Sequence, residues 1–522
     1  MRVLFIVRDL QGAEPLGVLY LASLLERGGH EVRLLGTRGL DLAREVAAFA
    51  PRVIGYGACT GQHTWYLALN RWLKRGHRFL SVFGGPHATF FPEMIEEDGV
   101  DVVCRGEGEE AMVELCDRLE AGRPVDEVEN LWVKREDGAI QRNPLRPLLT
   151  DLDSLPFPNR ELRFAADPGA RGWAAHSFLT SRGCPYSCAY CFNPSMQALY
   201  GPAWGKRRLR SPANVVEEIA SVRAISGLSF VQFRCSMFPD EPAWLEEFAE
   251  IYRRRVGLPF YCHVRADHMT ERAVGALARA GCKSVNMGIE CAGEDYRREV
   301  LRRPMSDQTL REACARLRAH GIAILADNIL GLPGRTFEDD LATLRLNLEC
   351  GVDYPLAMLL QPYPGTAIAE TARRSGEFDG DLSSIDFTYY QRSPLKRDPR
   401  QKRRIENLQK LFALAVEAPA LLPLILRLVD LPPNLVFHSV FRCWFLWCYH
   451  TRVMPHRLRP REVLQVLAGV FGVHRKEAFD GSAEQGQEGG GPGRRDRGRS
   501  GGGRLPRLLA RLGRLRAQAR PA

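Results

Sequence analysis

Continuous apolar runs alternate with amphipathic stretches over the first 145 residues. Runs of this kind predict strands that are buried on both faces, as in a parallel sheet. The predicted strands are 1–7, 32–36, 52–57, 79–85 and 100–106, and the predicted helices are the stretch that ends at Gly28-Gly29 and then 41–50, 64–75 and 107–121. Strand–helix alternation of this kind predicts an α/β domain with a doubly wound parallel sheet over residues 1–145.

Glycines and small polar residues follow several of these predicted strands. Gly12, the segment 59–62 and the segment 84–87 should meet at one edge of the sheet. Ligands bind to doubly wound sheets beyond the carboxyl ends of the strands, so this edge is a candidate binding site. No GxGxxG motif follows the first strand, which disfavours a dinucleotide.

The middle of the chain has a second α/β pattern. A proline-rich linker over 146–170 reads as extended backbone. Residues 171–390 again alternate, with a predicted helix over 211–227, a strand over 228–234 and a helix over 270–282. Periodicity alone indicates only a further α/β domain here.

Residues 391–478 are strongly apolar and are interrupted by prolines and charges. They contain no uninterrupted run of about 20 apolar residues, so a transmembrane helix is disfavoured. A C-terminal helical region is therefore predicted, with two interpretations. The helices pack on the preceding α/β domain, or they present an apolar face to a lipid surface.

The tail, 479–522, is rich in Gly, Gln and Arg, and we expect it to be disordered. Its end places leucines along one helical stripe between arginines, a basic amphipathic pattern that suits an anionic membrane or an acidic partner. A dispensable solvated tail is the alternative. Residues 494–522 hold ten arginines and one aspartate, which accounts for nearly all of the net charge of +10. The remaining chain is near neutrality, and no specific nucleic-acid partner is expected.

The amino terminus has only a five-residue apolar run before Arg8 and Asp9, so no signal peptide is expected. The chain contains 14 cysteines, many of them alone inside apolar runs. That distribution is typical of reduced, buried cysteines rather than a disulfide framework. We therefore predict a cytoplasmic protein, with peripheral contact at the inner membrane face as a further hypothesis.

Three cysteines stand together in a CxxxCxxC spacing, Cys184, Cys188 and Cys191, with Tyr190 before the last. Three thiolates within eight residues can converge on one iron–sulfur cluster. A cubane cluster held by three thiolates leaves one iron open for a substrate or cofactor. A zinc site or a set of structural cysteines is the alternative, but zinc usually requires a second ligand pair, and none follows.

This spacing resembles the signature of the radical S-adenosylmethionine (SAM) superfamily. The stretches 261–267, 284–293, 329–339 and 361–368 resemble later parts of the same family in the same order. The resemblance implies a partial (β/α)6 barrel over 171–390, a [4Fe-4S] cluster on the three cysteines, and SAM as a cofactor. The residues that it implies as SAM contacts are Tyr190, Ser236, Arg265, Glu290, Gly331 and Gly334.

Other interpretations of these residues stay open. Gly331 and Gly334 flank Pro333 and suit ordinary turns, and Glu290 suits a salt bridge at a strand end. The segment 231–241 departs from the family because it lacks the acidic residues expected near the SAM amino group. Ser236 could still accept a hydrogen bond there, whereas Asp240 lies too far along.

Cys235, in the same segment, is either a reactive thiol or a buried structural cysteine, and the second interpretation is favoured.

The first half resembles the cobalamin-binding, Rossmann-like domain of B12-dependent radical SAM enzymes. The stretches 14–23, 83–89 and 104–111 carry this resemblance. The DxHxxG motif of free-standing B12 domains is replaced by RDLQGAEPLG, so cobalamin is expected without that histidine ligand. His87 is expected to be a loop histidine bonded to backbone. The implied cobalamin contacts are Gly12, Cys59, Thr60, Gly84, Gly85 and Gly106.

The family pattern implies methylation of an unactivated carbon of a small-molecule or lipid-like substrate. In it, one SAM yields the radical that abstracts hydrogen, methylcobalamin donates the methyl group, and a second SAM replaces it. A cobalamin-dependent radical cyclase without methyl transfer is the alternative, as is a non-catalytic cluster protein. Methylthiolation is disfavoured because no second cysteine trio occurs in the first half. An external electron donor of flavodoxin or ferredoxin type is expected.

Overall fold

The computed structural model describes residues 1–10, 14–38, 40–386 and 388–455. These residues belong to one compact unit, Met1–Phe479. The predicted contact Gly12 and the predicted basic tail lie outside the described residues. Among the described residues, no helix is both long and apolar enough to cross a membrane.

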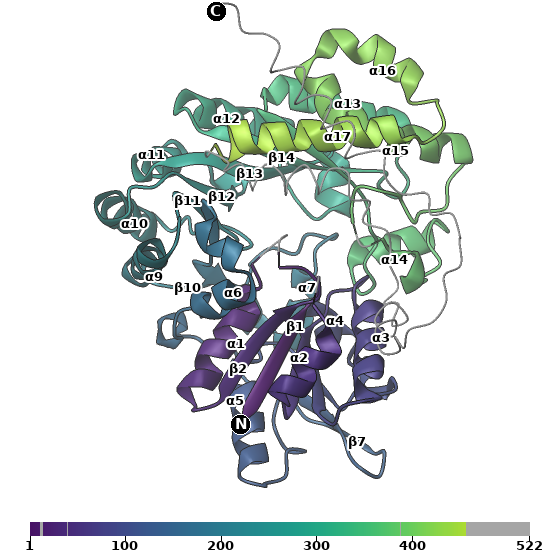
Figure 1. Ribbon diagram of the computed structural model, residues 1–522. Coiled ribbons are helices and arrows are strands. Elements are labelled where there is room, and N and C mark those ends of the chain that lie inside the picture. Colours follow the sequence, from purple (N-terminus) through teal and green to yellow (C-terminus); the bar gives the residue numbers. More distant parts are fainter. Residues whose placement is uncertain (11–13, 39, 387, 456–522) are drawn as a thin grey trace, which may run out of the picture. The chain divides into compact units, whose positions relative to one another are not determined.

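The first domain is built on a seven-stranded sheet in the order β2-β1-β3-β4-β5-β6-β7 (Figure 1). Its strands are β1 (Arg2–Val7), β2 (Glu31–Gly36), β3 (Val53–Gly57), β4 (Leu80–Gly84), β5 (Val102–Cys104), β6 (Leu131–Lys134) and β7 (Ile140–Arg142). The first five strands pair in parallel, as predicted, and β6 and β7 extend the sheet in antiparallel fashion. The order reverses between β1 and β3, so a ligand site is expected at the carboxyl ends of those two strands.

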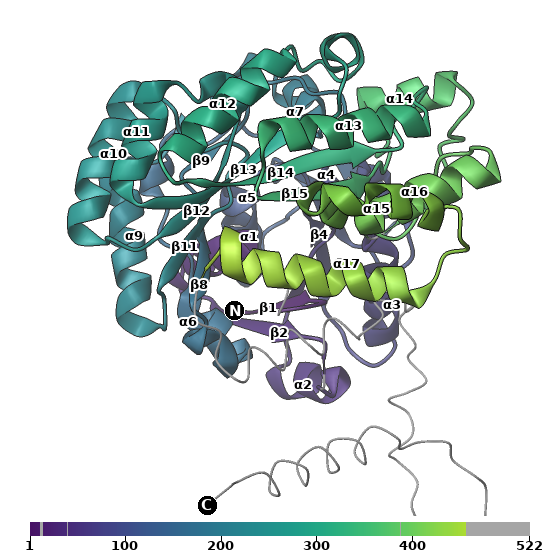
Figure 2. The ribbon, with the colours of Figure 1, turned by 90° about the horizontal axis from the view of Figure 1, so that it is seen from above.

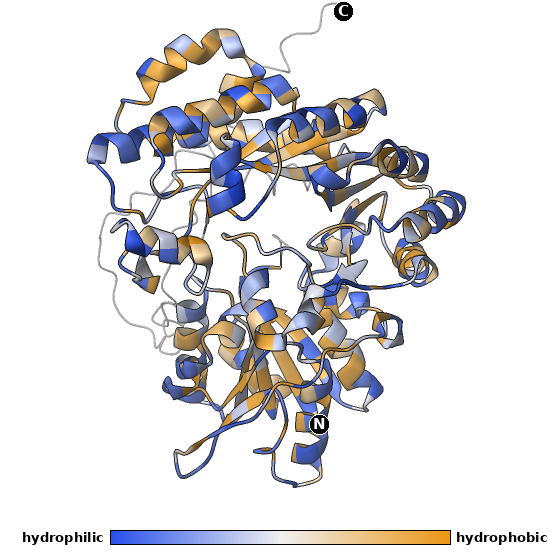
Figure 3. Ribbon diagram, turned by 180° about the vertical axis from the view of Figure 1, so that it is seen from behind, coloured by the Kyte–Doolittle hydropathy of each residue, from blue (hydrophilic) through white to orange (hydrophobic). Residues whose placement is uncertain are grey.

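Helices cover both faces of this sheet. They are α1 (Leu16–Arg27), α2 (Leu42–Phe49), α3 (His63–Lys74), α4 (Pro86–Phe90), η1 (Pro92–Glu96) and α5 (Glu109–Glu120). The apolar sides of α1 and α5 pack on one face, and those of α2 and α3 pack on the other. Figure 3 shows the strands as largely hydrophobic and the helices as mixed, which is the pattern that burial on both sheet faces requires.

The segment after β7 is not simply extended, because it contains η2 (Leu152–Ser154), α6 (Arg160–Ala166) and η3 (Pro168–Gly172). Buried Arg160 at the start of α6 contacts Glu14 at 3.0 Å and Glu218 at 3.1 Å. Glu14 precedes α1, and Glu218 lies on a helix of the second α/β domain, α9 (Pro212–Ile225). This buried ion network therefore links the two α/β domains through the predicted linker.

The second domain is a curved, parallel, six-stranded sheet in the order β15-β14-β13-β12-β11-β8. Its strands are β8 (Ala175–Phe178), β11 (Phe230–Phe233), β12 (Phe260–Val264), β13 (Cys282–Glu290), β14 (Ala323–Leu330) and β15 (Tyr354–Leu359). The strands β8 and β15 stay at the two edges, so the barrel is open. The predicted partial (β/α)6 barrel is confirmed.

The helices of this domain pack on the outer face of its sheet, together with the first C-terminal helix. They are α9, α10 (Pro242–Arg255), α11 (Glu271–Ala280), α12 (Asp307–Ala319) and α13 (Phe337–Cys350), and α14 (Ala367–Arg374) follows β15. Smaller elements are β9 (Ser181–Arg182), α7 (Asn193–Tyr200), α8 (Pro202–Gly205), β10 (Arg208–Leu209), η4 (Ala266–His268), the π-helical turn η5 (Tyr296–Val300) and η6 (Leu382–Ser384).

The C-terminal region is helical, as predicted, and packs on the barrel. It comprises α15 (Pro399–Glu417), η7 (Pro419–Leu421), α16 (Leu422–Leu428), α17 (Leu435–Cys448) and the π-helical turn η8 (Tyr449–Val453). Helix α15 lies against β15 and α13, and α17 runs beside α15 (Figure 2). Cys448, Val453 and Met454 join Tyr261 and Leu325 in a cluster on the inner face of the sheet. The chain thus fills the amino-terminal end of its own barrel.

Candidate active site

The three predicted cluster cysteines lie on the loop between β9 and α7. Cys184 and Cys188 are buried, Cys191 is half-buried, and all three are free thiols. Burial, with the nearby sulfurs of Cys188 and Cys184, outweighs the hydrogen bonds from Asn193 and raises the pKa of Cys191 to about 11. The same two causes, burial and then Cys188, raise the pKa of Cys184. The loop therefore gathers three sulfurs close enough to influence one another.

Backbone hydrogen bonds fix this loop to two neighbouring connections of the barrel. The amide of Ala189 donates to Leu301 O at 2.9 Å, and the amide of Ile368 donates to Ala189 O at 2.9 Å. At the loop's start, Gly183 has φ +84°, and a Cβ there would come within 2.9 Å of Trp204 O. The loop geometry thus depends on a glycine and on anchors outside the loop.

Two arginines approach the central thiol. Nη1 of Arg265 lies 3.8 Å from Sγ of Cys188, and Nη1 of Arg303 lies 4.0 Å from the same sulfur. Arg265 also stacks over the Tyr186 ring at 3.6 Å. Their positive charge would offset the negative charge of a group bound at this sulfur. Arg303 was not predicted, because it lies in a turn that carries no motif.

Glu290 is turned toward the cysteine loop. Its φ is +67°, in the left-handed region, and its Oε1 accepts a 2.7 Å hydrogen bond from the Tyr190 hydroxyl. Arg303 lies 3.8 Å from the same oxygen. A Cβ on Gly288 would come within 1.9 Å of Oε1, so the glycine two residues earlier is needed for this carboxylate position. The predicted SAM contact is thus also a salt-bridged strand-end residue.

The glycines after β14 form a turn held by carboxylates. Gly331 and Gly334 both have φ +69°. The amide of Gly331 donates to Asp340 Oδ1 at 3.2 Å, and that of Gly334 donates to Glu377 Oε1 at 2.7 Å. Burial raises the pKa of Asp340 to about 7. Both glycines therefore lie in a turn, as the alternative interpretation predicted. Their role as SAM contacts stays a prediction.

The segment 231–241, which lacks the expected acidic residues, includes the end of β11. Ser236 is exposed, whereas Cys235 is buried with its sulfur 3.2 Å from the Thr180 hydroxyl, as a structural cysteine would be. Asp240 binds Arg207 and His268, so its carboxylate is already engaged. No acidic side chain therefore takes the expected place in this segment.

The predicted cobalamin edge collects the ends of β3 and β4. The amide of Ala58 donates to Gly84 O at 2.8 Å, and a Cβ on Gly85 (φ +91°) would come within 2.9 Å of Ala58 O. Cys59, at the same edge, is exposed. Gly106, after β5, lies instead under Tyr200, whose hydroxyl would be 1.7 Å from its Cβ. Packing against α7 therefore accounts for the glycine at position 106.

A histidine pair lies at this edge. The rings of His63 and His87 stack with centroids 3.7 Å apart, and His87 Nδ1 lies 3.1 Å from the Thr60 hydroxyl. Burial, and then His63, lowers the pKa of His87 to about 3, so its ring is neutral. The expected backbone bond of His87 is replaced by this side-chain partner.

The inner face of the barrel carries polar groups that sequence patterns did not reveal. Asp327 on β14 bonds to Asn286 on β13, and burial, followed by the charge of Glu290, raises the pKa of Asp327 to about 7. His263 on β12 has a buried Nε2 without a hydrogen-bond partner among the described residues. The hydroxyl of Tyr449, in η8, accepts a 3.3 Å hydrogen bond from Nη2 of Arg234. These residues form a polar layer between Glu290 and the apolar cluster that includes Cys448, Val453 and Met454.

Comparison with known proteins adds two domain matches. A model described as the radical SAM superfamily matches residues 178–346, and one described as the B12 binding domain matches residues 4–116. The chain is 30% identical over 367 residues to an uncharacterized methyltransferase, PH0819, of Pyrococcus horikoshii, across 69% of this chain and 78% of that protein. The chain belongs to the cobalamin-dependent radical SAM family.

A further relative of this radical SAM enzyme is named for a different activity. The chain is 24% identical over 430 residues to an anaerobic magnesium-protoporphyrin IX monomethyl ester cyclase of Rubrivivax gelatinosus, across 75% of this chain and 72% of that protein. Two solved structures share the fold of this chain. OxsB has a TM-score of 0.63 at 14% identity, covering 90% of this chain and 83% of that one. TsrM of Kitasatospora setae has a TM-score of 0.60 at 21% identity, covering 72% and 76%.

The cofactors of this radical SAM enzyme are a [4Fe-4S] cluster, SAM and cobalamin, as expected from the sequence. The residues present suit the cluster. Among the described residues, no three Cys, His, Asp or Glu side chains converge on a point that a single metal ion would fill. A cubane cluster is held differently, because each thiolate binds a different iron. Three clustered thiols beside two guanidiniums fit that anionic group.

Proposed function

We propose that this radical SAM enzyme methylates an unactivated carbon of a small-molecule or lipid-like substrate. The observation that carries the proposal is one cavity, bounded both by α7, which follows the cysteine loop, and by α4 and Arg105 at the carboxyl edge of the B12-binding sheet. A substrate there would lie beside both cofactor regions. Such a position suits a carbon that loses hydrogen on one side and receives a methyl group from the other.

Cys184, Cys188 and Cys191 are the proposed cluster ligands, with Glu290, Arg265, Tyr190 and the turn at Gly331 and Gly334 around SAM. When bound, the cluster and SAM supply a hydrogen-abstracting radical, and cobalamin supplies the methyl group. Arg265 and Arg303 would offset the negative charge of the thiolates. Glu290, held by Tyr190 and Arg303, would present a fixed carboxylate to a hydroxyl or ammonium group.

The inner polar layer would receive the part of a ligand that enters the barrel. Asp327 has a pKa of about 7 and can therefore hold or release a proton near neutral pH. His263 offers an Nε2 that has no partner within the described part of the chain. Below them, the apolar cluster that includes Cys448, Val453 and Met454 excludes water from the amino-terminal end of the barrel. Radical chemistry benefits from this exclusion because side reactions with solvent are prevented.

A radical cyclization or oxidation without methyl transfer is the second candidate. It is favoured by the similarity to the Rubrivivax gelatinosus cyclase, which extends over most of both chains. In methylation, one substrate hydrogen is exchanged for a methyl group and two SAM molecules are consumed. One leaves as 5′-deoxyadenosine and methionine, and the other leaves as S-adenosylhomocysteine. A cyclase would consume SAM without forming S-adenosylhomocysteine.

Product analysis separates these candidates. Anaerobic, reconstituted protein is incubated with SAM and dithionite, and the products are quantified by mass spectrometry. Deoxyadenosine together with S-adenosylhomocysteine supports methylation, whereas deoxyadenosine alone supports the cyclase. Neither product would point to a non-catalytic cluster protein. In lipid and metabolite extracts of a deletion strain, the loss of a species and the gain of one lighter by one methylene would identify the substrate.

Two partners complete the proposal. A flavodoxin- or ferredoxin-type protein would supply in the cell the two electrons that each methylation consumes. The C-terminal helices would contact a membrane surface peripherally, because Leu424, Leu435 and Val436 expose 53%, 76% and 66% of their area. Large exposed apolar side chains gathered on adjacent helices are typical of an interfacial surface.

A further inference from the structure

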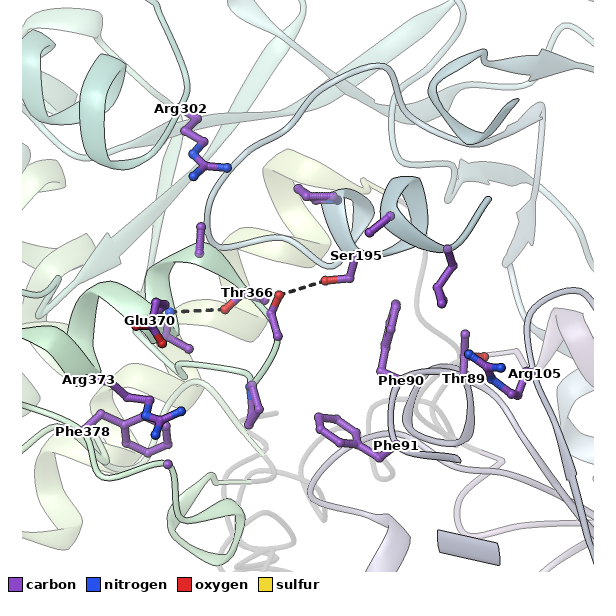
Figure 4. A pocket seen from close by; sticks show the side chains of 18 residues that line it. Thr89, Phe90, Phe91, Arg105, Ser195, Arg302, Thr366, Glu370, Arg373 and Phe378 are labelled. Carbon is purple, nitrogen blue, oxygen red and sulfur yellow. Dashed lines mark hydrogen bonds between the residues drawn. The ribbon is translucent and has the colours of Figure 1, made fainter. Parts of the chain in front are cut away.

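The cavity beside the cysteine loop has a volume of about 630 Å³. It is lined from the first domain by Thr89, Phe90, Phe91 and Arg105. From the barrel, α7, Arg302 and the residues around α14 line it (Figure 4). Its first-domain wall follows β4 and β5, next to the predicted cobalamin contacts Gly84, Gly85 and Gly106. The cavity therefore borders the edge where the corrinoid is expected.

Three guanidiniums line this cavity, Arg105, Arg302 and Arg373. None of them forms an ion pair with an acidic side chain in the described part of the chain, and Nε of Arg105 is buried without a hydrogen-bond partner there. Glu370 is the single acidic residue of the lining. Its carboxylate lies 3.9 Å from Nε of Arg374, which is not part of the lining. With three guanidiniums against one carboxylate, the lining carries a net positive charge, which favours an anionic occupant.

Most of the other large side chains of the lining are apolar. Phe90 and Phe91 form one side, and Phe378 lies beside Arg373 on the other (Figure 4). Pro194 and Pro364 add rigid apolar surface. Ligand cavities with mostly apolar walls and a few placed charges bind the body of a ligand by burial and its orientation by the charges. An anion with an apolar body matches both parts.

One of the arginines has a backbone conformation that side chains seldom adopt. Arg302 has φ +52°, in the left-handed region. This conformation precedes Arg303, whose guanidinium lies 4.0 Å from Cys188 Sγ. Adjacent residues therefore face in different directions, one toward the cluster loop and one toward the cavity. An anion held at Arg302 would place the attached body beside the reacting region.

We propose that this cavity is the substrate site for an amphipathic anion, a carboxylate or phosphate ester on an apolar body, with Arg302 and Arg373 as its anion contacts. The inference rests on the proposed function, because it assigns the cavity to the substrate of that reaction. Guanidiniums suit both carboxylate and phosphate because their paired N–H donors match two oxygens. The nucleotide phosphate of the corrinoid has the same chemistry, and the test must separate the two sources.

Binding of octyl phosphate to the full-length reconstituted protein tests the site by calorimetry. We expect Arg302→Gln and Arg373→Gln each to weaken binding by about tenfold, because each removes a charge-assisted hydrogen bond. Arg345→Gln, which removes an exposed arginine of α13, should leave affinity within about twofold. Octyl glucoside, a neutral probe with the same octyl chain, should bind the wild type more weakly than octyl phosphate does. The substitutions should not change its affinity. Equal affinity across the three variants, or no binding of octyl phosphate by the wild type, would overturn the proposal.

Corrinoid uptake by the same variants separates the sources. We expect Arg302→Gln and Arg373→Gln to take up hydroxocobalamin and cobinamide, which lacks the nucleotide phosphate, as the wild type does. Selective loss of hydroxocobalamin uptake would assign the arginines to the cofactor and overturn the substrate site. Deoxyadenosine and S-adenosylhomocysteine, measured on the wild type, report the proposed reaction separately. Anion binding without these products would retain the site and reject the reaction.

Discussion

The hydroxyl of Tyr190 donates a 2.7 Å hydrogen bond to Oε1 of Glu290 and so joins the cysteine loop to the end of β13. Glu290 is buried and Tyr190 is half-buried. Arg303 lies within 4 Å of both side chains. The bond couples the proposed cluster ligands to the proposed SAM carboxylate. A change at either residue should therefore alter SAM binding without removing the thiols.

We expect Glu290→Gln to weaken SAM binding by about tenfold, because it removes a charged acceptor. Tyr190→Phe should weaken it less, because Arg303 still holds the carboxylate. SAM affinity is measured by equilibrium dialysis, and iron content is measured on the same samples. Glu299→Gln, at an exposed position of η5, is the control. Unchanged SAM affinity in Glu290→Gln would assign this residue a structural role only.

Substituting a cluster cysteine should abolish cluster assembly. We expect Cys184→Ala, Cys188→Ala and Cys191→Ala each to lose most of the roughly four irons that a cubane cluster contains. Cys235→Ala is the matched control, because Cys235 is buried nearby and bonded to Thr180. Iron and sulfide are quantified after anaerobic reconstitution. Full iron content in any of the three variants would remove that cysteine from the ligand set.

The buried network at Arg160 should contribute strongly to stability. Arg160→Ala leaves Glu14 and Glu218 buried without their shared partner, and this should cost about 3–5 kcal/mol of unfolding free energy. Arg254→Ala removes an exposed i,i+4 pair with Glu250 and should cost less than about 1 kcal/mol. Urea denaturation followed by tryptophan fluorescence compares the two variants. Similar losses would show that the network is not specially stabilising.

The two α/β patterns, the cysteine loop and the position of Glu290 were all predictable from the sequence, because each follows from local periodicity or from a compact motif. The ends of β13 and β14 match the predicted stretches closely. Arg303 and Asp327 were not predictable, since they reach the site only through packing of distant segments. The two interpretations of the C-terminal region also required the fold. Cys448 and Val453 pack inside the barrel, whereas Leu435 stays exposed.

Acid should weaken the same network through Glu14. Burial raises the pKa of Glu14, but Arg160, together with bonds from His176 and the Ser177 amide, outweighs burial and lowers it to about 2. A carboxyl with a depressed folded-state pKa contributes fully above its unfolded value, about 4.3, and loses that contribution as pH falls toward 2. The stability difference between wild type and Glu14→Gln should therefore shrink over this range. Urea midpoints of the cluster-free proteins measure it, and a constant difference would contradict the assignment.

The exposed leucines of the C-terminal helices should support membrane contact. Leu424 lies on α16 and Leu435 begins α17, and both are exposed. We expect the double variant Leu424→Glu, Leu435→Glu to lower binding to vesicles containing anionic lipid by about tenfold, because it removes apolar area and adds repulsion. Co-sedimentation measures the bound fraction, and Ile225→Glu, at the exposed end of α9, is the control.

Deletion of residues 480–522 separates the helices from the basic tail in the same assay. If the deleted protein still binds vesicles and the double substitution then releases it, the α16–α17 surface is the contact. If deletion alone abolishes binding, the arginine-rich tail is responsible and the exposed leucines are not sufficient. Sedimentation that neither change alters would exclude both surfaces, because no other described large apolar side chain is as exposed as Leu435 and Val436. Peripheral membrane contact through the C-terminal region would then be rejected.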